Sequence, residues 1–175
     1  SVYDVIEINV KDTFGEQNNY DYFKINVKGC FKNAEGIIKE VDGFYSKDYQ
    51  ISDTGEVQET GTGKFKIRFT PDRSGKWNYK IKILKRGNLF AETKWETFYC
   101  KNDAKQKGFI RVSKTDDLFM EFSNGIPFYA IGLNICWSTG DVLKDYERWL
   151  TQLKENGGNF IRLWMANWFA GIEWI

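Results

Sequence analysis

Two segments, FYAIGLNICW at residues 128–137 and NFIRLWMANW at residues 159–168, indicate the architecture of this chain. Each is a short apolar run that ends in a cluster of polar and aromatic residues. Between them, residues 142–156 carry apolar side chains at spacings of three and four, the period of an amphipathic helix. Strand, helix and strand in this order predict a βαβ unit, from which parallel sheets are built.

The predicted helix has a recognisable start and end. Asp141 suits the N-cap position, and Gly157 with Gly158 suits the terminator. The apolar face consists of Val142, Leu143, Tyr146, Trp149, Leu150 and Leu153. Because the opposite face is charged, we expect this helix to cover one side of a sheet and to take no part in chemistry.

Alternation along residues 159–165 separates two faces of the second predicted strand. One face carries Ile161, Leu163 and Met165. The other face carries Phe160, Arg162 and Trp164. In a barrel strand, the side chains of one face contact the surrounding helices and those of the other face point into the barrel. The aliphatic face suits contact with the helices. Arg162 then lies inside, where a charge must be paired. It pairs either with a carboxylate that serves packing, or with an active-site carboxylate whose pKa it lowers.

Polar and aromatic residues follow both predicted strands, at the edge where barrel enzymes place their active sites. We predict a sugar-contacting site there, because tryptophan rings suit the apolar C–H faces of sugars; the alternative for the tryptophans is plain packing under loops. The predicted substrate-contacting residues are Asn134, Trp137, Arg162, Trp164 and Trp168. Cys136, Asn167, Glu173 and Trp174 also fall near this edge, and we interpret Glu173 as a loop contact and not as a catalyst.

The first hundred residues alternate apolar and polar side chains in short runs separated by turn-forming residues. The predicted strands are residues 2–10, 22–31, 37–45, 63–70, 76–84 and 89–99. This pattern is typical of an Ig-like antiparallel β-sandwich. We therefore predict a mainly β chain: a sandwich domain at residues 1–103, then residues 104–175 with a hairpin (108–112 and 118–122) and the βαβ start of an incomplete (β/α)8 barrel.

Trp77 and the pair Phe44–Tyr45 are aromatic residues with two readings each. Trp77 lies on a central predicted strand, which favours a core position over an exposed sugar platform. Phe44 and Tyr45 precede a turn, where they could form the edge of a binding surface.

Composition narrows the classes of function. Lys and Arg number 25 against 24 Asp and Glu, and this balance argues against a nucleic-acid partner. No segment is long enough for a membrane helix. The absence of histidine excludes Ser-His-Asp and Cys-His catalysis within this chain. Cys30, Cys100 and Cys136 show no CxxC spacing, so we expect buried or partly buried free thiols, with a Cys30–Cys100 bridge as the alternative.

Three motifs carry a family resemblance: VDGFY at residues 41–45, FKIRFTP at residues 65–71 and SGKWNY at residues 74–79. They resemble the sandwich domain of unknown function DUF5060, found at the N-terminus of bacterial glycoside hydrolases with a clan-A, GH5-like barrel. Ser46-Lys47-Asp48 replaces the Asp-Gly of that pattern. Residues 108–134 resemble the hairpin at the bottom of such a barrel and its first strand, with Asn124 in place of Asp. NFIRLWM resembles the second strand, whose interior arginine neighbours the nucleophile.

The resemblance implies a retaining glycoside hydrolase acting on polysaccharide, without a cofactor. Its two carboxyl groups, about 5 Å apart, belong to strands four and seven of the barrel, which this chain would not contain. We therefore expect the fragment by itself to be inactive, with no predicted catalytic residue and no metal. Because the strands at residues 126–137 and 160–168 are uncovered, we expect the fragment either to associate with itself through them or to leave that region distorted.

Two other functions remain open: a sandwich that binds carbohydrate, and a sandwich that only supports the barrel. We expect an extracellular or cell-surface location, with a cytoplasmic one as the alternative. Because no signal peptide precedes Ser1, a secreted protein would be present here in its mature form.

Overall fold

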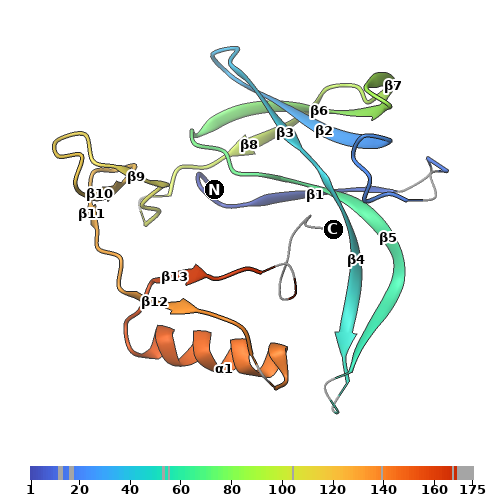
Figure 1. Ribbon diagram of the computed structural model, residues 1–175. Coiled ribbons are helices and arrows are strands. Elements are labelled where there is room, and N and C mark those ends of the chain that lie inside the picture. Colours follow the sequence, from blue (N-terminus) through green and yellow to red (C-terminus); the bar gives the residue numbers. More distant parts are fainter. Residues whose placement is uncertain are drawn as a thin grey trace.

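The computed structural model describes residues 1–11, 14–15, 18–52, 54, 56–103, 105–138, 140–166 and 168. The protein is mainly β, as predicted, and its described part contains thirteen strands and one helix (Figure 1). Two antiparallel sheets form the sandwich, a small antiparallel sheet follows, and a parallel pair of strands with its helix comes last.

The sandwich consists of a three-stranded and a five-stranded sheet. The first has the order β1 (Ile6–Lys11), β5 (Val57–Phe69) and β4 (Phe44–Ile51). The second has the order β3 (Ile38–Asp42), β2 (Ile25–Asn33), β6 (Gly75–Lys85) and β7 (Asn88–Glu92), and β8 (Glu96–Cys100) also pairs with β6. Alternate side chains of both sheets point inward and form one core. Its most buried large residues are Trp77, Phe31, Ile25, Ile67 and Val27.

Trp77 is a core residue, only 1% exposed, so the structure contradicts its reading as a sugar platform. Its ring contacts Phe69 at 5.1 Å and stacks on Phe98 at 6.4 Å between centroids. The indole Nε1 donates a hydrogen bond to the carbonyl oxygen of Arg73 at 3.0 Å, which satisfies the polar atom that burial removes from water.

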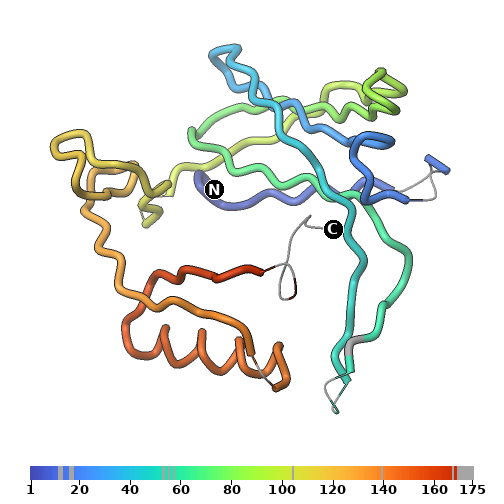
Figure 2. Tube along the Cα trace, in the orientation of Figure 1, coloured from blue at the N-terminus to red at the C-terminus, as the bar shows by residue number. Residues whose placement is uncertain are grey.

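The predicted strand 37–45 is in fact two strands in different sheets. β3 ends at Asp42 and β4 begins at Phe44, and the chain runs through Gly43 from one sheet into the other without a reversal (Figure 2). The Gly43 N–H donates to the carbonyl oxygen of Val27 at 2.6 Å. A Cβ at this position would lie 2.9 Å from that oxygen and 3.0 Å from the carbonyl oxygen of Lys66. The alternation of apolar and polar residues continues across this crossing, so the sequence pattern alone predicted a single strand.

Two further boundaries differ from the prediction. The expected strand 89–99 is divided into β7 and β8, which pair with opposite ends of β6. The expected strand 63–70 starts earlier, at Val57, because β5 pairs with β4 through Ile51–Val57 to form a long hairpin. Most of the extra part of this hairpin is polar on both faces, so it shows no alternation.

Cys30 and Cys100 are buried free thiols, and the alternative of a bridge between them is wrong. Cys30 pairs with Lys80 across β2 and β6, whereas Cys100 pairs with Gly75 across β8 and β6. The two cysteines therefore lie on different neighbours of β6 and at different heights along it. Cys136 is exposed.

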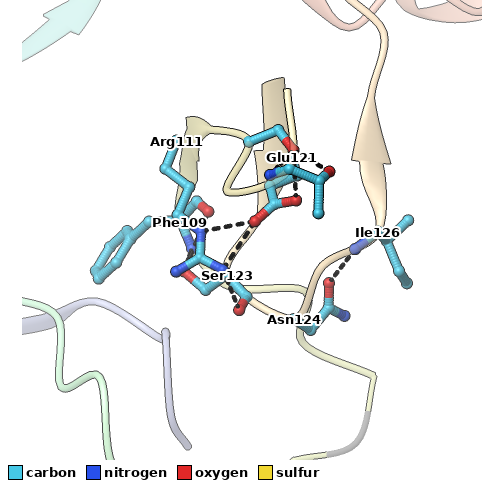
Figure 3. A network of polar contacts seen from close by, with 8 residues as sticks. Phe109, Arg111, Glu121, Ser123, Asn124 and Ile126 are labelled. Atoms are coloured by element: carbon cyan, nitrogen blue, oxygen red, sulfur yellow. Dashed lines mark hydrogen bonds and ion pairs between the residues drawn. The ribbon is translucent and has the colours of Figure 1, made fainter. Parts of the chain in front are cut away.

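Residues 105–128 form a compact antiparallel sheet beside the sandwich. β9 (Ile110–Val112) and β10 (Met120–Phe122) are the predicted hairpin, and β11 (Pro127–Phe128) adds a third strand. Glu121, 8% exposed, accepts hydrogen bonds from Arg111 at 2.9 and 3.1 Å and from the Ser113 hydroxyl at 3.0 Å (Figure 3). This network satisfies the buried carboxylate, whose pKa is held below its usual value by Ser113 and Arg111 against the opposing effect of burial.

This sheet is joined to the sandwich by specific contacts. The Gln106 side-chain amide donates to Asp4 Oδ1 at 2.8 Å, and the ring of Phe109 meets Tyr3 edge to face at 5.2 Å. Gln106, in the segment between β8 and β9, thus contacts the first residues of the chain.

The predicted βαβ unit is confirmed. β12 (Gly132–Ile135) and β13 (Phe160–Leu163) pair in parallel, and α1 (Val142–Glu155) connects them. Asp141 is the N-cap, and its side chain accepts from the Lys144 N–H at 3.2 Å. Gly157 follows with a φ of +79°, the left-handed conformation that ends helices.

Candidate functional site

The candidate site lies at the carboxyl ends of β12 and β13. Asn134 and Arg162 are register partners in the parallel ladder, so their side chains leave the same face of the two strands. Leu133 with Ile161 and Ile135 with Leu163 pair on the other face. The alternation predicted for β13 is therefore confirmed, and it places two of the predicted contact residues side by side.

Three predicted tryptophans meet just beyond these strand ends. The ring centroid of Trp137 lies 5.8 Å from that of Trp164 and 4.8 Å from that of Trp168. All three rings keep exposed surface: 38% for Trp137, 59% for Trp164 and 64% for Trp168. We call these three residues the tryptophan cluster. Its rings are open to solvent and are not covered core residues of the described chain.

Arg162 is exposed, and within the described ranges it forms no ion pair. The described residues therefore do not support the interpretation that Arg162 pairs with a carboxylate whose role is only in packing. Its guanidinium lies on the face of Asn134 and can donate in a planar fork to a ligand oxygen or to a carboxylate. The other reading, a neighbouring catalytic carboxylate, requires residues that this part of the chain does not supply.

Two residues that were not singled out as site residues hold the strand pair in place, one at each end. The Asn159 side chain accepts from the Ile131 N–H at 2.9 Å and donates to the carbonyl oxygen of Tyr129 at 2.9 Å. It thereby joins the starts of β12 and β13. The Tyr146 hydroxyl on α1 donates to the carbonyl oxygen of Cys136 at 3.0 Å, just before Trp137. Asn159 directly follows Gly157-Gly158 in the sequence, and this position is the signal from which its role could have been predicted.

Asn167, Glu173 and Trp174, which the sequence also placed near this edge, lie outside the described residues. Among the described residues, no group of three or more acidic or cysteine side chains could hold a metal ion. The described rim offers amide, guanidinium and aromatic groups. These groups can bind and orient a neutral polyol, whereas acid–base cleavage of a glycosidic bond needs two carboxyl groups.

A cavity of about 660 Å³ lies between β12 and α1. Its lining is largely apolar, includes Leu133, Ile135, Trp149 and Leu153, and contains no charged residue. Val142, Leu143 and Leu150 of α1 remain 39–44% exposed. The helix therefore covers only part of this strand pair. The cavity extends to the candidate site, since Asn134 and Trp137 are also among its lining residues. No helix of the described chain has the length and hydropathy to cross a membrane.

Comparison with known proteins agrees with this architecture. Residues 1–83 match the family model "Domain of unknown function (DUF5060)". No curated protein sequence matches the chain. Among solved structures, the chain is similar to a crystal structure of a "putative glycoside hydrolase" from Bacteroides vulgatus, with a TM-score of 0.61 and 20% sequence identity.

This similarity covers 93% of the present chain and 27% of the Bacteroides vulgatus protein. The shared fold therefore extends beyond the DUF5060 region, through most of the small sheet and the βαβ unit. The chain spans about a quarter of the length of that protein. At this identity the comparison shows a common fold.

Proposed function

We propose that this chain is the N-terminal part of a glycoside hydrolase with a (β/α)8 barrel, and that its tryptophan cluster, Asn134 and Arg162 contact the sugar substrate. The observation that carries the proposal is the meeting of Trp137, Trp164 and Trp168 at the carboxyl ends of two parallel strands. Ligands of parallel α/β folds bind at this edge. Exposed indole rings provide flat apolar surfaces for sugar rings, and the in-register amide and guanidinium provide donors for hydroxyl groups.

In this proposal the two catalytic carboxyl groups belong to later barrel strands, and residues 1–103 form a separate accessory domain. The 175-residue chain then binds sugar weakly and does not hydrolyse it. The substrate class is polysaccharide outside the cell or at its surface. Support comes from the similarity in fold to a protein described as a glycoside hydrolase and from the DUF5060 match.

The first experiment is an activity assay of the 175-residue chain on aryl β-glycosides and soluble β-glucans. We expect no turnover above a heat-denatured control. Turnover that survives repeated purification would contradict the assignment of catalysis to later strands.

The second experiment tests binding at the rim. Replacing tryptophan by 5-fluorotryptophan gives each indole its own ¹⁹F resonance, which single Trp→Phe variants assign. We expect neutral β-linked hexasaccharides to shift the resonances of Trp137, Trp164 and Trp168 and to leave that of buried Trp77 unchanged. A titration that moves none of the three cluster resonances would refute the proposed contact.

We also propose that the uncovered strand pair associates with a second copy when the chain is isolated. Leu133 is 59% exposed, Phe160 48% and Leu163 40%, and the apolar cavity beneath α1 is open beside them. Exposed apolar strands at a sheet edge favour pairing. Light scattering should show a concentration-dependent dimer, and Leu133→Lys should shift it to monomer. A monomer at all concentrations with an intact βαβ unit would disprove this part.

A further inference from the structure

A separate cavity lies on the sandwich, where the chain crosses between the sheets. Its volume is about 370 Å³, and its walls are the loop 18–24, the start of β2 and the crossing at Gly43. This volume falls within the range of about 300–1,000 Å³ that ligand pockets occupy. Phe44 and Tyr45, which the sequence suggested as the edge of a binding surface, both line it.

Aromatic rings line this cavity; Tyr20 is anchored on the core through Tyr45, whereas the ring of Tyr22 contacts that of exposed Phe23 at 4.2 Å. Tyr20 packs edge to face on Tyr45 at 5.1 Å, and Tyr45 packs on buried Phe65 at 5.1 Å. Tyr20 nevertheless remains 59% exposed, and Tyr22, on the same loop, is 61% exposed. Large aromatic rings that are held by the core but left open to solvent provide flat apolar surfaces at little cost in conformational entropy.

The loop that carries these tyrosines is held by its own hydrogen bonds. The Asn18 side chain accepts from the Tyr20 N–H at 3.0 Å, and the Asp21 side chain accepts from the Phe23 N–H at 3.2 Å. The N–H groups of Lys24 and Ile25 donate to the Asp21 carbonyl oxygen at 3.0 and 3.1 Å. Tyr20 and Tyr22 are thus positioned before any ligand binds, which lowers the entropic cost of binding.

Polar groups lie at one side of the same cavity. Asn26 Nδ2 donates to Asp42 Oδ1 at 3.3 Å, and Lys28 Nζ lies 3.1 Å from the same oxygen. Within the described residues, Asp42 Oδ2 accepts no hydrogen bond, and the Asp42 side chain is 67% exposed. A carboxylate oxygen and a neighbouring amide, fixed relative to each other, can accept from and donate to adjacent hydroxyl groups.

The charge of the lining narrows the ligand class. Asp42 is the one charged residue among the described lining residues, and the nearby Lys28 ammonium is already paired with Asp42 and Glu40, so the lining offers no free cation to phosphate, sulfate or uronic acid ligands. Flat rings combined with hydroxyl-binding groups and no net attraction for anions fit a neutral pyranose. A purely apolar ligand would take water away from Asp42 Oδ2, which accepts no hydrogen bond from the described residues, and this desolvation costs free energy.

We infer that the cavity formed by Tyr20, Tyr22, Asn26, Asp42 and Phe44 on the sandwich binds a neutral pyranose unit of an oligosaccharide. The choice of glycans to test rests on the proposed function, whereas the site itself does not depend on the tryptophan cluster. Tyr22 stacks on a ring face, and Asp42 and Asn26 hold adjacent hydroxyl groups. The site would keep the sandwich on the polysaccharide while a barrel acts on it.

The test is calorimetric titration of the 175-residue chain with cellohexaose, xylohexaose, mannohexaose and laminarihexaose, with oligogalacturonate as the anionic comparison. We expect at least one neutral hexasaccharide to bind and oligogalacturonate not to bind. Tyr22→Ala and Asp42→Ala should each weaken that binding about tenfold or more. Tyr99→Ala is the matched control, because Tyr99 is a 73% exposed tyrosine on β8 outside the cavity lining. Far-UV circular dichroism checks the fold of every variant.

The outcomes separate this site from the rim. Binding that is lost in Tyr22→Ala and kept in Trp168→Ala supports the sandwich site, whatever the result at the rim. Binding that is lost in Trp168→Ala and kept in Tyr22→Ala overturns the sandwich site and leaves the proposed function standing. Absence of binding by all four neutral hexasaccharides at millimolar concentration overturns the inference, as does equal loss in Tyr99→Ala and Tyr22→Ala.

Discussion

The ring of Trp168 meets the ring of Trp137 edge to face, with 4.8 Å between their centroids and 65° between their planes. The two residues follow different strands of the parallel pair, so this contact exists only when β12 and β13 lie side by side. Edge-to-face contacts of this kind contribute about 0.5–1.5 kcal/mol beyond the burial of area. The contact links the arrangement of the rim to the integrity of the βαβ unit.

The first prediction follows from this contact. Trp137→Ala removes the ring that touches both Trp164 and Trp168, so the ¹⁹F resonances of both should move toward the position of a solvated indole. Trp95→Phe is the control, since Trp95 is a 45% exposed tryptophan of the sandwich. Unchanged resonances of Trp164 and Trp168 in Trp137→Ala would show that the cluster does not form in solution.

The second prediction concerns the crossing at Gly43. Gly43→Ala should lower the free energy of unfolding by about 1–3 kcal/mol, because the added Cβ meets two backbone carbonyl oxygens that cannot move independently of their strands. Urea denaturation measures the change. Gly140→Ala is the matched control, since a Cβ there meets only Asp145 Oδ2, at 3.5 Å, an ordinary contact. Equal stability of the two variants would contradict the close approach.

The third prediction concerns the pH dependence of stability. Hydrogen bonds from Lys82, Cys30 and Lys28 lower the pKa of Glu40 to about 2, from the ordinary value of 4.5. Between pH 4.5 and about 2 the unfolded state therefore binds more protons at this site than the folded state. The stabilisation is present above pH 4.5 and is lost as the pH falls toward 2.

Glu40→Gln should flatten this loss. The side chain of Glu40 is 40% exposed, so solvent screens the interaction and the effect should stay below about 1 kcal/mol. The measurement is the free energy of unfolding across this pH range, with Glu147→Gln on the exposed face of α1 as control. Parallel curves for Glu40→Gln and the unsubstituted chain would disprove the assignment.

The fourth prediction concerns the thiols. Burial raises the pKa of Cys30, with a further contribution from its hydrogen bond to Glu40, and burial also raises the pKa of Cys100. The thiolate is the reactive form, so both should resist alkylation near neutral pH. Exposed Cys136 should react first with a thiol reagent, followed by two further equivalents on denaturation. Rapid reaction of all three in the native state, or only one in denaturant, would contradict the structure.

Local patterns were enough to predict the βαβ unit, because apolar spacing, Asp141 and the Gly157-Gly158 pair act within a few residues of one another. They also placed Arg162 on one face of β13, and Ile161 with Leu163 on the other, through simple alternation. The core position of Trp77 followed from its place on a central strand. The free thiols were the expected outcome as well, although only the pairing of β6 with β2 and β8 shows that Cys30 and Cys100 lie on different neighbours of that strand.

Other features depend on contacts between distant segments. Alternation is the same on either side of Gly43, so only the pairing of β3 with β2 and of β4 with β5 reveals a change of sheet. The largely polar first half of β5 forms a strand because β4 lies beside it. The third strand of the small sheet also depends on pairing between distant segments. The same is true of Asn159, whose side chain joins the starts of β12 and β13.

By itself, the sequence determined the mainly β composition, the strand–helix–strand order and the residue types at the rim, since these depend on local periodicity and turn chemistry. Only the tertiary structure decided that Trp137, Trp164 and Trp168 touch and that Asn134 and Arg162 share a face in register. It also brought Tyr20, Tyr22 and Asp42 around one cavity. Such meetings depend on the register between strands, which hydrogen bonding across the sheet determines and neighbours along the chain do not.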